Sequence, residues 1–362
     1  MRMTLFVPGR RPALRCVVAQ PPQATGSVRA ALLAQGAGAR RRLLVAALAF
    51  LILLRLVASA EAAAFAEAFS SDPADRGWRT VGDTSLFQWN PASQNLKVTW
   101  DSGRPNSYFY RPLGTIMAKS DDFSLAFDLV LEEMKVGVTP NKPFTFQIAL
   151  GFLNFKAATQ TNFVRGTGAQ SPHLVEFNYF PDSGFGATVS PVVVSSNNQF
   201  IPSFSFPLEL IVGDLFHVAM TYRGSNQTLA TTMTRNGQPF GPVKDVRLPT
   251  QFSDFRVDTL AISSYNDAGA GGSLFARGRL DNLALSISDP PIADLVGNLR
   301  IDGWSVEFAA RTNWLYALER TEDFKTWISL GPPRPGTGRR DIFVDSDLRQ
   351  PKAFYQIRAE RP

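Results

Sequence analysis

The chain has very few of the residues that carry thiol and imidazole chemistry. Its 362 residues include one cysteine, Cys16, and two histidines, His173 and His217. A single cysteine excludes an intrachain disulfide, so the folded part must be held by its core or by bound metal. Two separated histidines without a second cysteine argue against a zinc site. The chain also lacks a G-x-S-x-G nucleophile elbow, so serine-hydrolase chemistry has no support.

Acidic residues and lysines are absent from residues 1–60, which contain nine arginines. The formal charge of the whole chain is +6, but without this segment 28 basic residues face 31 acidic ones. The basic excess therefore belongs to the N-terminal segment alone. The remainder gives no electrostatic support for binding to nucleic acid.

A long hydrophobic run occurs once, at residues 43–54 (LLVAALAFLILL). Arginines at 40–42 precede it, and the small residues 58–60 follow it. This layout is typical of a secretory signal peptide, and the run is short of the roughly 20 residues that span a bilayer. We predict a leader over residues 1–60, with cleavage after residue 60 or, as second choice, residue 62.

An uncleaved signal anchor with the same orientation is the alternative to cleavage. Both interpretations place the rest of the chain outside the cytoplasm, in the cell envelope or secreted. After cleavage the leader leaves no segment for stable membrane insertion. An exported chain without disulfides suits a bacterial envelope better than a eukaryotic extracellular module.

Residues 65–289 show the pattern of an antiparallel β-sandwich. Short runs rich in Val, Ile, Phe, Tyr and Thr alternate with turn clusters every 8 to 15 residues, and helices are scarce. The predicted strands are 85–89, 96–100, 107–113, 123–132, 144–152, 174–180, 188–195, 214–222, 228–236, 258–265 and 278–287. About eleven strands fit a large jelly roll better than an immunoglobulin domain. Asn236 and Gly237 predict a tight type I′ hairpin turn.

A second, smaller β unit is predicted after the step Asp289-Pro290-Pro291, which favours an extended linker. We assign residues 290–295 to the linker and 296–362 to a small β-sandwich-like domain. Its predicted strands are 304–308, 315–319, 326–330, 341–344 and 354–358. The unit resembles C-terminal modules of exported proteins of Verrucomicrobia. The matching residues are Trp304, Val306, Phe308, Tyr316, Leu318, Glu319, Arg320, Asp323, Trp327, Phe354 and Tyr355, whereas Gln356 departs from the usual basic residue.

The stretch 174–189 (LVEFNYFPDSGFGATV) resembles the metal-loop region of L-type, legume-like lectins, whose fold is a concanavalin A-like jelly roll related to laminin-G domains. In the family pattern V-E-F-D-T-(Y/F)-x-N-x-x-x-G-D, Glu176 matches the strand Glu and Phe180 the residue that offers its carbonyl. Asn178 replaces the strand Asp and Asp182 the loop Asn. Ala187 occupies the place of a further metal-binding Asp. The resemblance implies at most one weak calcium site, at Glu176, Asn178, Phe180 and Asp182.

Residues two apart on a strand point to one face, so Glu176 and Asn178 share a face in either interpretation. The alternative to a calcium site is that both are solvent-facing strand residues beside the turn at 181–184. Calcium prefers oxygen ligands, which this set supplies. The sequence is therefore compatible with a calcium site and with a structural role for both residues.

Glycosidases of the same general fold carry E-x-D-x-x-E on one strand, because a retaining mechanism needs two carboxyls about 5 to 5.5 Å apart. From Glu176 the sequence gives Asn178 and Pro181 instead. Glu132 and Glu133 form an adjacent pair, but neighbours on a strand point to opposite faces. The sequence therefore predicts a protein that is not an enzyme.

The Gly-rich run 267–272 (DAGAGG) lacks the Gly-Lys-Ser/Thr of a phosphate loop. Together with Tyr265, Asn266 and Asp267 it could bind a sugar, with the aromatic ring stacking on the C–H face. A plain hairpin tip is the alternative. His217 lies in the segment GDLFHVAMTY, which is similar to a strand of laminin-G and concanavalin-like sandwiches where the histidine is structural.

These observations predict an exported, non-catalytic carbohydrate-binding protein whose partner is a glycan or a cell-surface or matrix component. The main alternative is a structural or adhesive surface protein that uses the sandwich as scaffold. A polysaccharide-degrading enzyme is the third, and it needs two carboxyls that meet across a groove. The fold alone does not decide between them.

Overall fold

The computed structural model describes residues 14–19, 63–165, 170–267, 271–300, 303–347 and 353–362. The described residues form two compact units: those between 63 and 288, the sandwich unit, and those from 289 to 362 together with 14–19, the C-terminal unit. The hydrophobic run 43–54 lies outside the described residues, so the leader stays a prediction. Within the described ranges, no helix has the length and apolarity needed to cross a membrane.

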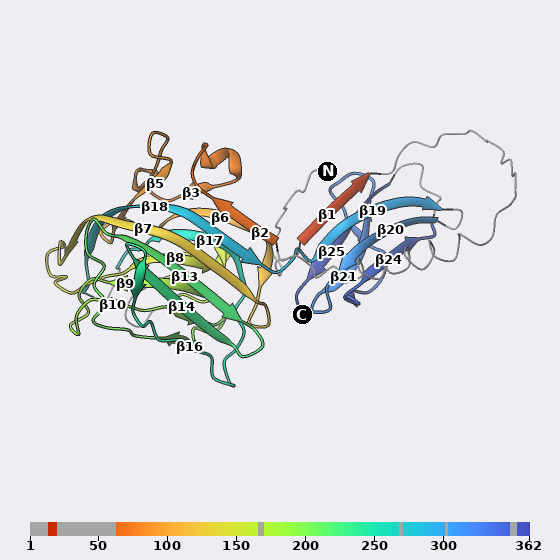
Figure 1. The fold of residues 1–362 in the computed structure, drawn as a ribbon. Helices are drawn as coiled ribbons and strands as arrows, with labels where there is room; N and C mark the ends of the chain where they lie inside the picture. The colour runs from red at the N-terminus through yellow and green to blue at the C-terminus, as the bar shows by residue number, and fades with distance from the viewer. Residues whose placement is uncertain (1–13, 20–62, 166–169, 268–270, 301–302, 348–352) are drawn as a thin grey trace, which may run out of the picture. The chain divides into compact units, whose positions relative to one another are not determined.

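The sandwich unit consists of two antiparallel sheets (Figure 1). The eight-stranded sheet contains, in spatial order, β12 (Phe200–Pro202), β11 (Val192–Val194), β9 (Leu174–Phe180), β8 (Ile148–Leu153), β17 (Val257–Ser264), β6 (Ser107–Met117) and β3 (Arg79–Val81), and β10 (Thr188–Val189) pairs with β9. The nine-stranded sheet contains β15 (Gln238–Phe240), β14 (Thr228–Arg235), β13 (Leu215–Arg223), β7 (Phe123–Val136), β18 (Leu274–Ile287), β5 (Asn95–Asp101) and β4 (Phe87–Asn90), with β16 (Val246–Arg247) on β14 and β2 (Ala63–Glu67) on β18. The predicted all-β antiparallel class is confirmed.

Helical segments in the described residues are short: α2 (Phe155–Ala158) and the 3-10 turns η1 (Pro73–Arg76) and η2 (Thr84–Leu86). Asn154 caps α2, because its side chain accepts a hydrogen bond from the backbone of Ala157 at 3.0 Å. The cap belongs to the connection between β8 and β9, whose described residues are 154–165 and 170–173. From this connection, Arg165 contacts Glu176 and Asn178 on the outer face of the eight-stranded sheet.

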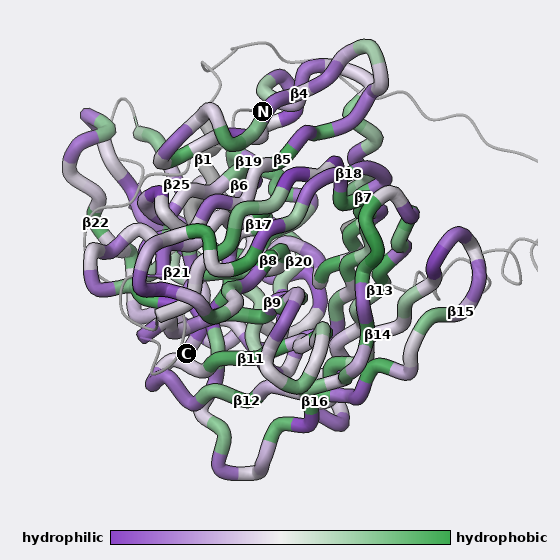
Figure 2. Tube along the Cα trace, turned by 90° about the vertical axis from the view of Figure 1, so that its left-hand side faces the viewer, coloured by the Kyte–Doolittle hydropathy of each residue, from purple (hydrophilic) through white to green (hydrophobic). Residues whose placement is uncertain are grey.

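The core lies between the two sheets. On β7, Leu125, Phe127, Leu129 and Leu131 are all buried, as the alternation of that segment predicts. Phe127 meets Phe177 of β9 edge to face, with ring centroids 5.6 Å apart. Figure 2 shows hydrophobic colour gathered along β7, β8 and β9.

The turn predicted at Asn236 and Gly237 is confirmed. Both residues have positive φ, 51° and 80°, and Arg235 pairs with Gln238 across the turn. Glycine and asparagine are the residues that tolerate this backbone region most easily, as a type I′ turn requires.

The predicted strand 144–152 begins later than expected, at Ile148. Phe144 bonds instead to a separate loop: its N–H donates to the carbonyl of Gly271, and its carbonyl accepts from Ser273. The run of apolar residues predicted one continuous strand. Its first residue, Phe144, instead forms its backbone hydrogen bonds with residues 271 and 273, and the strand begins only at Ile148. The predicted strand 188–195 is likewise divided into β10 and β11.

The C-terminal unit consists of two further antiparallel sheets among the described residues. One contains β1 (Leu14–Ala19), β25 (Phe354–Glu360), β21 (Leu315–Thr321) and β22 (Ile328–Ser329), with β23 (Arg334–Pro335) on β21. The other contains β19 (Ile292–Arg300), β20 (Gly303–Ala310) and β24 (Arg340–Asp345). Trp304 of β20 stacks on Tyr355 of β25 with centroids 3.9 Å apart, so the two sheets share a core.

The structure of this unit differs from the sequence-based prediction at the linker and at residues 14–19, and it gives Gln356 a hydrogen-bonding role. The predicted linker 290–295 overlaps β19, which begins at the buried Ile292 directly after the two prolines. Gln356, where the family pattern has a basic residue, donates a 2.6 Å hydrogen bond to the buried Glu319. Residues 14–19, which we assign to the leader, pair with β25.

Candidate functional site

Strand β9 sorts its side chains onto two faces. Phe177 points into the core between the sheets, so its neighbours Glu176 and Asn178 point to the outer face of the eight-stranded sheet. This shared face agrees with the sequence-based expectation. Both residues are nevertheless buried, and Arg165 from the connection between β8 and β9 contacts them. They are therefore not solvent-facing strand residues.

The carboxylate of Glu176 is held by an arginine and a tyrosine. Its Oε2 lies 3.1 Å from Nη2 of Arg165, and its Oε1 accepts a hydrogen bond from the hydroxyl of Tyr265. Glu176 is 1% exposed and Arg165 2%. Burial raises the pKa of Glu176, against the opposing effects of the Arg165 charge and the Tyr265 hydroxyl.

This arrangement fits a metal ion poorly. A second cation about 4 Å from the Arg165 guanidinium would be repelled by about 4 kcal/mol per unit charge at an effective dielectric constant near 20. Asp182, the other predicted carboxylate ligand, is exposed and accepts a 3.0 Å hydrogen bond from the backbone of Gly184 in its own loop. Among the described residues, no three His, Cys, Asp or Glu side chains lie close enough together to hold a metal.

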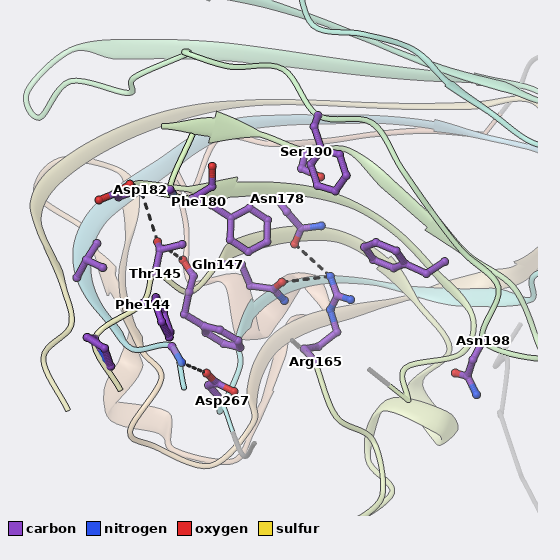
Figure 3. Close-up of a pocket in the computed structure, with 18 residues that line it drawn as sticks. Phe144, Thr145, Gln147, Arg165, Asn178, Phe180, Asp182, Ser190, Asn198 and Asp267 are labelled. Carbon is purple, nitrogen blue, oxygen red and sulfur yellow. Dashed lines mark hydrogen bonds between the residues drawn. The ribbon is translucent and has the colours of Figure 1, made fainter. Parts of the chain in front are cut away.

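A cavity of about 990 Å³ opens beside these residues on the sandwich unit (Figure 3). That volume is at the upper end of the range for small-molecule sites, about 300–1,000 Å³. In the close-up, Phe144, Thr145 and Asp182 lie at one end and Asn198 at the other, with Gln147, Arg165 and Asn178 between them. The lining of the cavity is thus polar in its middle.

The polar middle consists of three buried side chains from different segments. Arg165 Nη2 donates to Oε1 of Gln147 and to Oδ1 of Asn178, each at 3.4 Å. Gln147 precedes β8, Asn178 is on β9, and Arg165 comes from the connection between these strands. The amide nitrogen of Gln147 is buried without a hydrogen-bond partner among the described residues. A buried amide donor without a partner lowers the stability of the fold, unless a ligand or a water molecule accepts its hydrogen bond.

The wall of the cavity is rich in phenylalanine. Phe144 is 69% exposed, and Phe200 and Phe204 are 47% exposed each. Beside them, Phe185 and Phe206 are also exposed and lie with ring centroids 5.6 Å apart. Exposed large apolar side chains that gather at one place mark a surface for binding rather than for folding.

The loop predicted to bind sugar, Tyr265 to Asp267, serves mainly as structure. Tyr265 is 1% exposed and packs against Tyr108, so its ring has no free face for stacking. Asn266 donates to the carbonyls of Ser102 and Arg104 at 3.0 Å each. Asp267 reaches the cavity, where its Oδ2 accepts a 2.5 Å hydrogen bond from the backbone of Gly272.

Gly272 allows this loop to come close to residue 145. A Cβ at position 272 would lie 2.3 Å from the carbonyl oxygen of Thr145 and 3.0 Å from Oδ2 of Asp267. No other residue fits there without movement of the backbone. The glycine therefore allows residue 272 to lie against the segment that precedes β8, and Asp267, Gly272 and Thr145 all line the cavity.

The remaining chemical groups singled out from the sequence lie elsewhere. Glu132 and Glu133 form ion pairs on the nine-stranded sheet, with Arg279 at 2.8 Å and Arg277 at 3.3 Å respectively. His217 Nδ1 lies 2.7 Å from Asp128, on the same sheet. None of them lines the cavity.

Sequence reasoning missed Gln147, Arg165 and the three exposed phenylalanines. Arg165 lies in a connection without periodicity, so no pattern connects it to Glu176. With 28 phenylalanines in the chain, composition does not reveal which are exposed. A glycine inside a predicted strand, at position 151, indicates the close approach of another backbone, but this signal identifies none of these residues.

Comparisons with known proteins give similarity of fold. Similar solved structures include peanut lectin with a 9mer peptide (12% identity, 64% of this chain and 100% of that chain, TM-score 0.40). Others are the seed lectin of Lotus tetragonolobus (12%, 63% and 100%, TM-score 0.39) and a legume lectin-like domain from Entamoeba histolytica (10%, 60% and 95%, TM-score 0.36). No protein-family model and no curated protein sequence matches the chain.

Proposed function

We propose that the chain is an exported, non-catalytic carbohydrate-binding protein and that a glycan occupies the cavity beside β9. One observation supports this most strongly. The cavity combines a buried amide donor without a partner, on Gln147, with the exposed rings of Phe144, Phe200 and Phe204. A convergent polar group in a largely apolar pocket is the usual form of a small-molecule site.

A sugar ring matches both parts of this surface. Its C–H face packs against an aromatic ring, and its hydroxyls and ring oxygen accept hydrogen bonds from amide donors. The cavity volume of about 990 Å³ suits several linked rings better than one. The ligand we expect is therefore a short segment of an oligosaccharide or polysaccharide.

Calcium is not needed for this proposal. The implied set of Glu176, Asn178, Phe180 and Asp182 contains one carboxylate that Arg165 already neutralises and one in an exposed loop. We therefore propose binding that is independent of calcium.

The structural or adhesive alternative would be favoured if the sandwich offered no hollow face with exposed aromatic residues. The exposed phenylalanines at the cavity weigh against it. For a glycosidase, the carboxylates that line the cavity are Asp182 and Asp267 among the described residues. Each accepts a backbone hydrogen bond within its own loop, which is a structural use of the group.

The test is binding of the full chain to a broad glycan array, once with calcium and once with a chelator. Two variants accompany it: Phe144→Ala, which removes an exposed ring, and Gln147→Leu, which removes the amide at similar size. Phe324→Ala is the matched control, because Phe324 is exposed but lies in the C-terminal unit.

We expect the wild type to bind one glycan class in both buffers. The affinity for that glycan should fall about tenfold or more in each cavity variant and should not change in the control. Release of reducing ends from the bound glycan would replace the non-catalytic proposal by an enzymatic one. Absence of binding to every glycan would favour the structural or adhesive alternative.

A further inference from the structure

We propose that the guanidinium of Arg165 is a built-in cation that stands where the lectin resemblance places a metal ion, and that it organises the floor of the cavity. The assignment rests on the contacts of Arg165 and holds whatever ligand the cavity takes.

Four oxygen atoms from four residues converge on this one guanidinium. Nη2 lies 3.1 Å from Glu176 Oε2 and 3.4 Å from the side-chain oxygens of Gln147 and Asn178. Nη1 donates to Oγ of Ser171 at 3.4 Å. A carboxylate, two amide oxygens and a hydroxyl are ligands that a hard cation would also take. Here a nitrogen cation of the chain itself occupies the space among them.

Arginine suits this position better than lysine. Its planar group carries five N–H donors in a fixed geometry and stays charged when buried, whereas a lysine ammonium has three donors and loses its proton more readily on burial. With Arg165 and Glu176 both almost fully buried, the charge of each compensates the other. The pair keeps the floor closed to a further cation.

The same contact sets the orientation of Gln147. Because Arg165 engages its oxygen, the amide nitrogen is the end that remains without a partner. Arg165 is thus a positioning residue: it turns Gln147 so that a donor is offered. That a ligand oxygen accepts from this donor is the step that rests on the proposed function, and the tests below do not depend on it.

The first test is a metal titration of the wild-type full chain, followed by thermal unfolding with calcium chloride, manganese chloride or EDTA. We expect the same melting temperature in all three solutions and no stoichiometric calcium after dialysis. A melting temperature that calcium raises and EDTA lowers would overturn the proposal, because the site would then hold a metal.

The second test is NMR of the full chain with ¹⁵N-labelled arginine and glutamine. A buried, paired guanidinium gives side-chain signals that exchange slowly, and Arg165→Met and Arg165→Lys both assign them. We expect these signals to persist on addition of calcium and to exchange faster in Glu176→Gln. Loss of the wild-type signals on addition of calcium would overturn the proposal.

The positioning role has its own readout, the side-chain amide signal of Gln147, assigned with Gln147→Leu. We expect it to broaden or shift in Arg165→Lys, which keeps the charge but not the fork of donors. An unchanged Gln147 signal would reduce Arg165 to a purely structural partner of Glu176.

Stability variants complete the test. Arg165→Met should lower the melting temperature by about 6 °C or more, because it leaves Glu176 buried and unpaired. The double variant Arg165→Met/Glu176→Gln should recover part of that loss. The control is Arg256→Met, whose partner Asp254 lies 3.1 Å away in a more exposed pair, and it should change the melting temperature little. Equal losses in the single and double variants would contradict the pairing.

Discussion

Gly151 of β8 pairs with Glu176 of β9, and a Cβ at position 151 would lie 2.7 Å from the Cα of Glu176 and 2.3 Å from the carbonyl oxygen of Val175. The two strands therefore come together here only because residue 151 has no side chain. The close approach of β8 fixes the position of the Glu176 backbone. It thereby also positions the carboxylate that pairs with Arg165.

The Gly151→Ala variant should therefore destabilise the sandwich unit. An added methyl group in a filled position costs about 1–3 kcal/mol, and each kcal/mol lowers the melting temperature of a domain this size by about 2–4 °C. Thermal unfolding followed by circular dichroism measures the effect. Gly331→Ala is the control, since a Cβ there meets nothing within 4 Å, and an equal loss in both variants would contradict the interpretation.

The pH dependence of stability should carry the signature of Glu176. Burial raises the pKa of this carboxyl above its ordinary value of 4.5. A carboxyl with a higher pKa in the folded state binds its proton more tightly there, so its contribution is complete below the unfolded pKa and is lost as the pH rises through the folded pKa.

We expect the free energy of unfolding of the wild type, relative to Glu176→Gln, to fall as the pH rises above about 4.5. The slope should be about 1.4 kcal/mol per pH unit between the two pKa values. Urea unfolding of both proteins from pH 4 to pH 8 measures this difference. A difference that stays constant or grows with pH would mean that the pKa of Glu176 is not raised.

The part of the fold that could be predicted from the sequence is the part that local patterns determine. On β7 the larger apolar residues alternate with smaller ones, and the structure buries Leu125, Phe127, Leu129 and Leu131, as that alternation predicts. The turn at Asn236 and Gly237 was predictable for a similar reason, because it depends on the backbone preferences of two adjacent residues. Such local signals do not depend on distant parts of the chain.

The floor of the site depends on distant parts of the chain, and so it was only partly predictable. Alternation placed Glu176 and Asn178 on one face, which is correct. It contained no information about Arg165, whose burial depends on how the β8–β9 connection folds over that face. The ring of Tyr265 likewise looked available in the sequence and is buried because Phe163 and Tyr108 pack around it.

The Trp304→Ala variant should unfold the C-terminal unit and leave the sandwich unit intact. Trp304 is buried against Tyr355, and truncation of such a residue costs about 3–5 kcal/mol. A unit of this size has little more stability than that to lose. Calorimetry should show one transition removed, while the sandwich unit keeps its own.

Trp327→Ala is the matched control, because Trp327 is only partly buried and its ring centroid lies 6.4 Å from that of Phe324. We expect a smaller loss of stability in this variant. If Trp304→Ala lowered the stability of both units together, they would not fold independently.

The leader makes a separate prediction about the mature chain. Expression in a bacterial host, followed by mass spectrometry of the exported protein, should give an N-terminus after residue 60 or, as second choice, residue 62. A retained N-terminus in the membrane fraction would support the signal anchor instead. A full-length chain in the cytoplasm would contradict export.

Cleavage would also change the edge of a sheet in the C-terminal unit. In the full chain, β1 pairs with β25 from Leu14 with Ala359 to Ala19 with Phe354. Without β1, β25 has β21 as its partner on one side only, and the backbone groups on the other side become an open edge. Amide hydrogen exchange should therefore be faster in β25 of the cleaved protein than in the full chain, while β20 serves as the internal control. Equal protection in both forms would mean that the pairing with β1 does not persist in solution or that another strand replaces it.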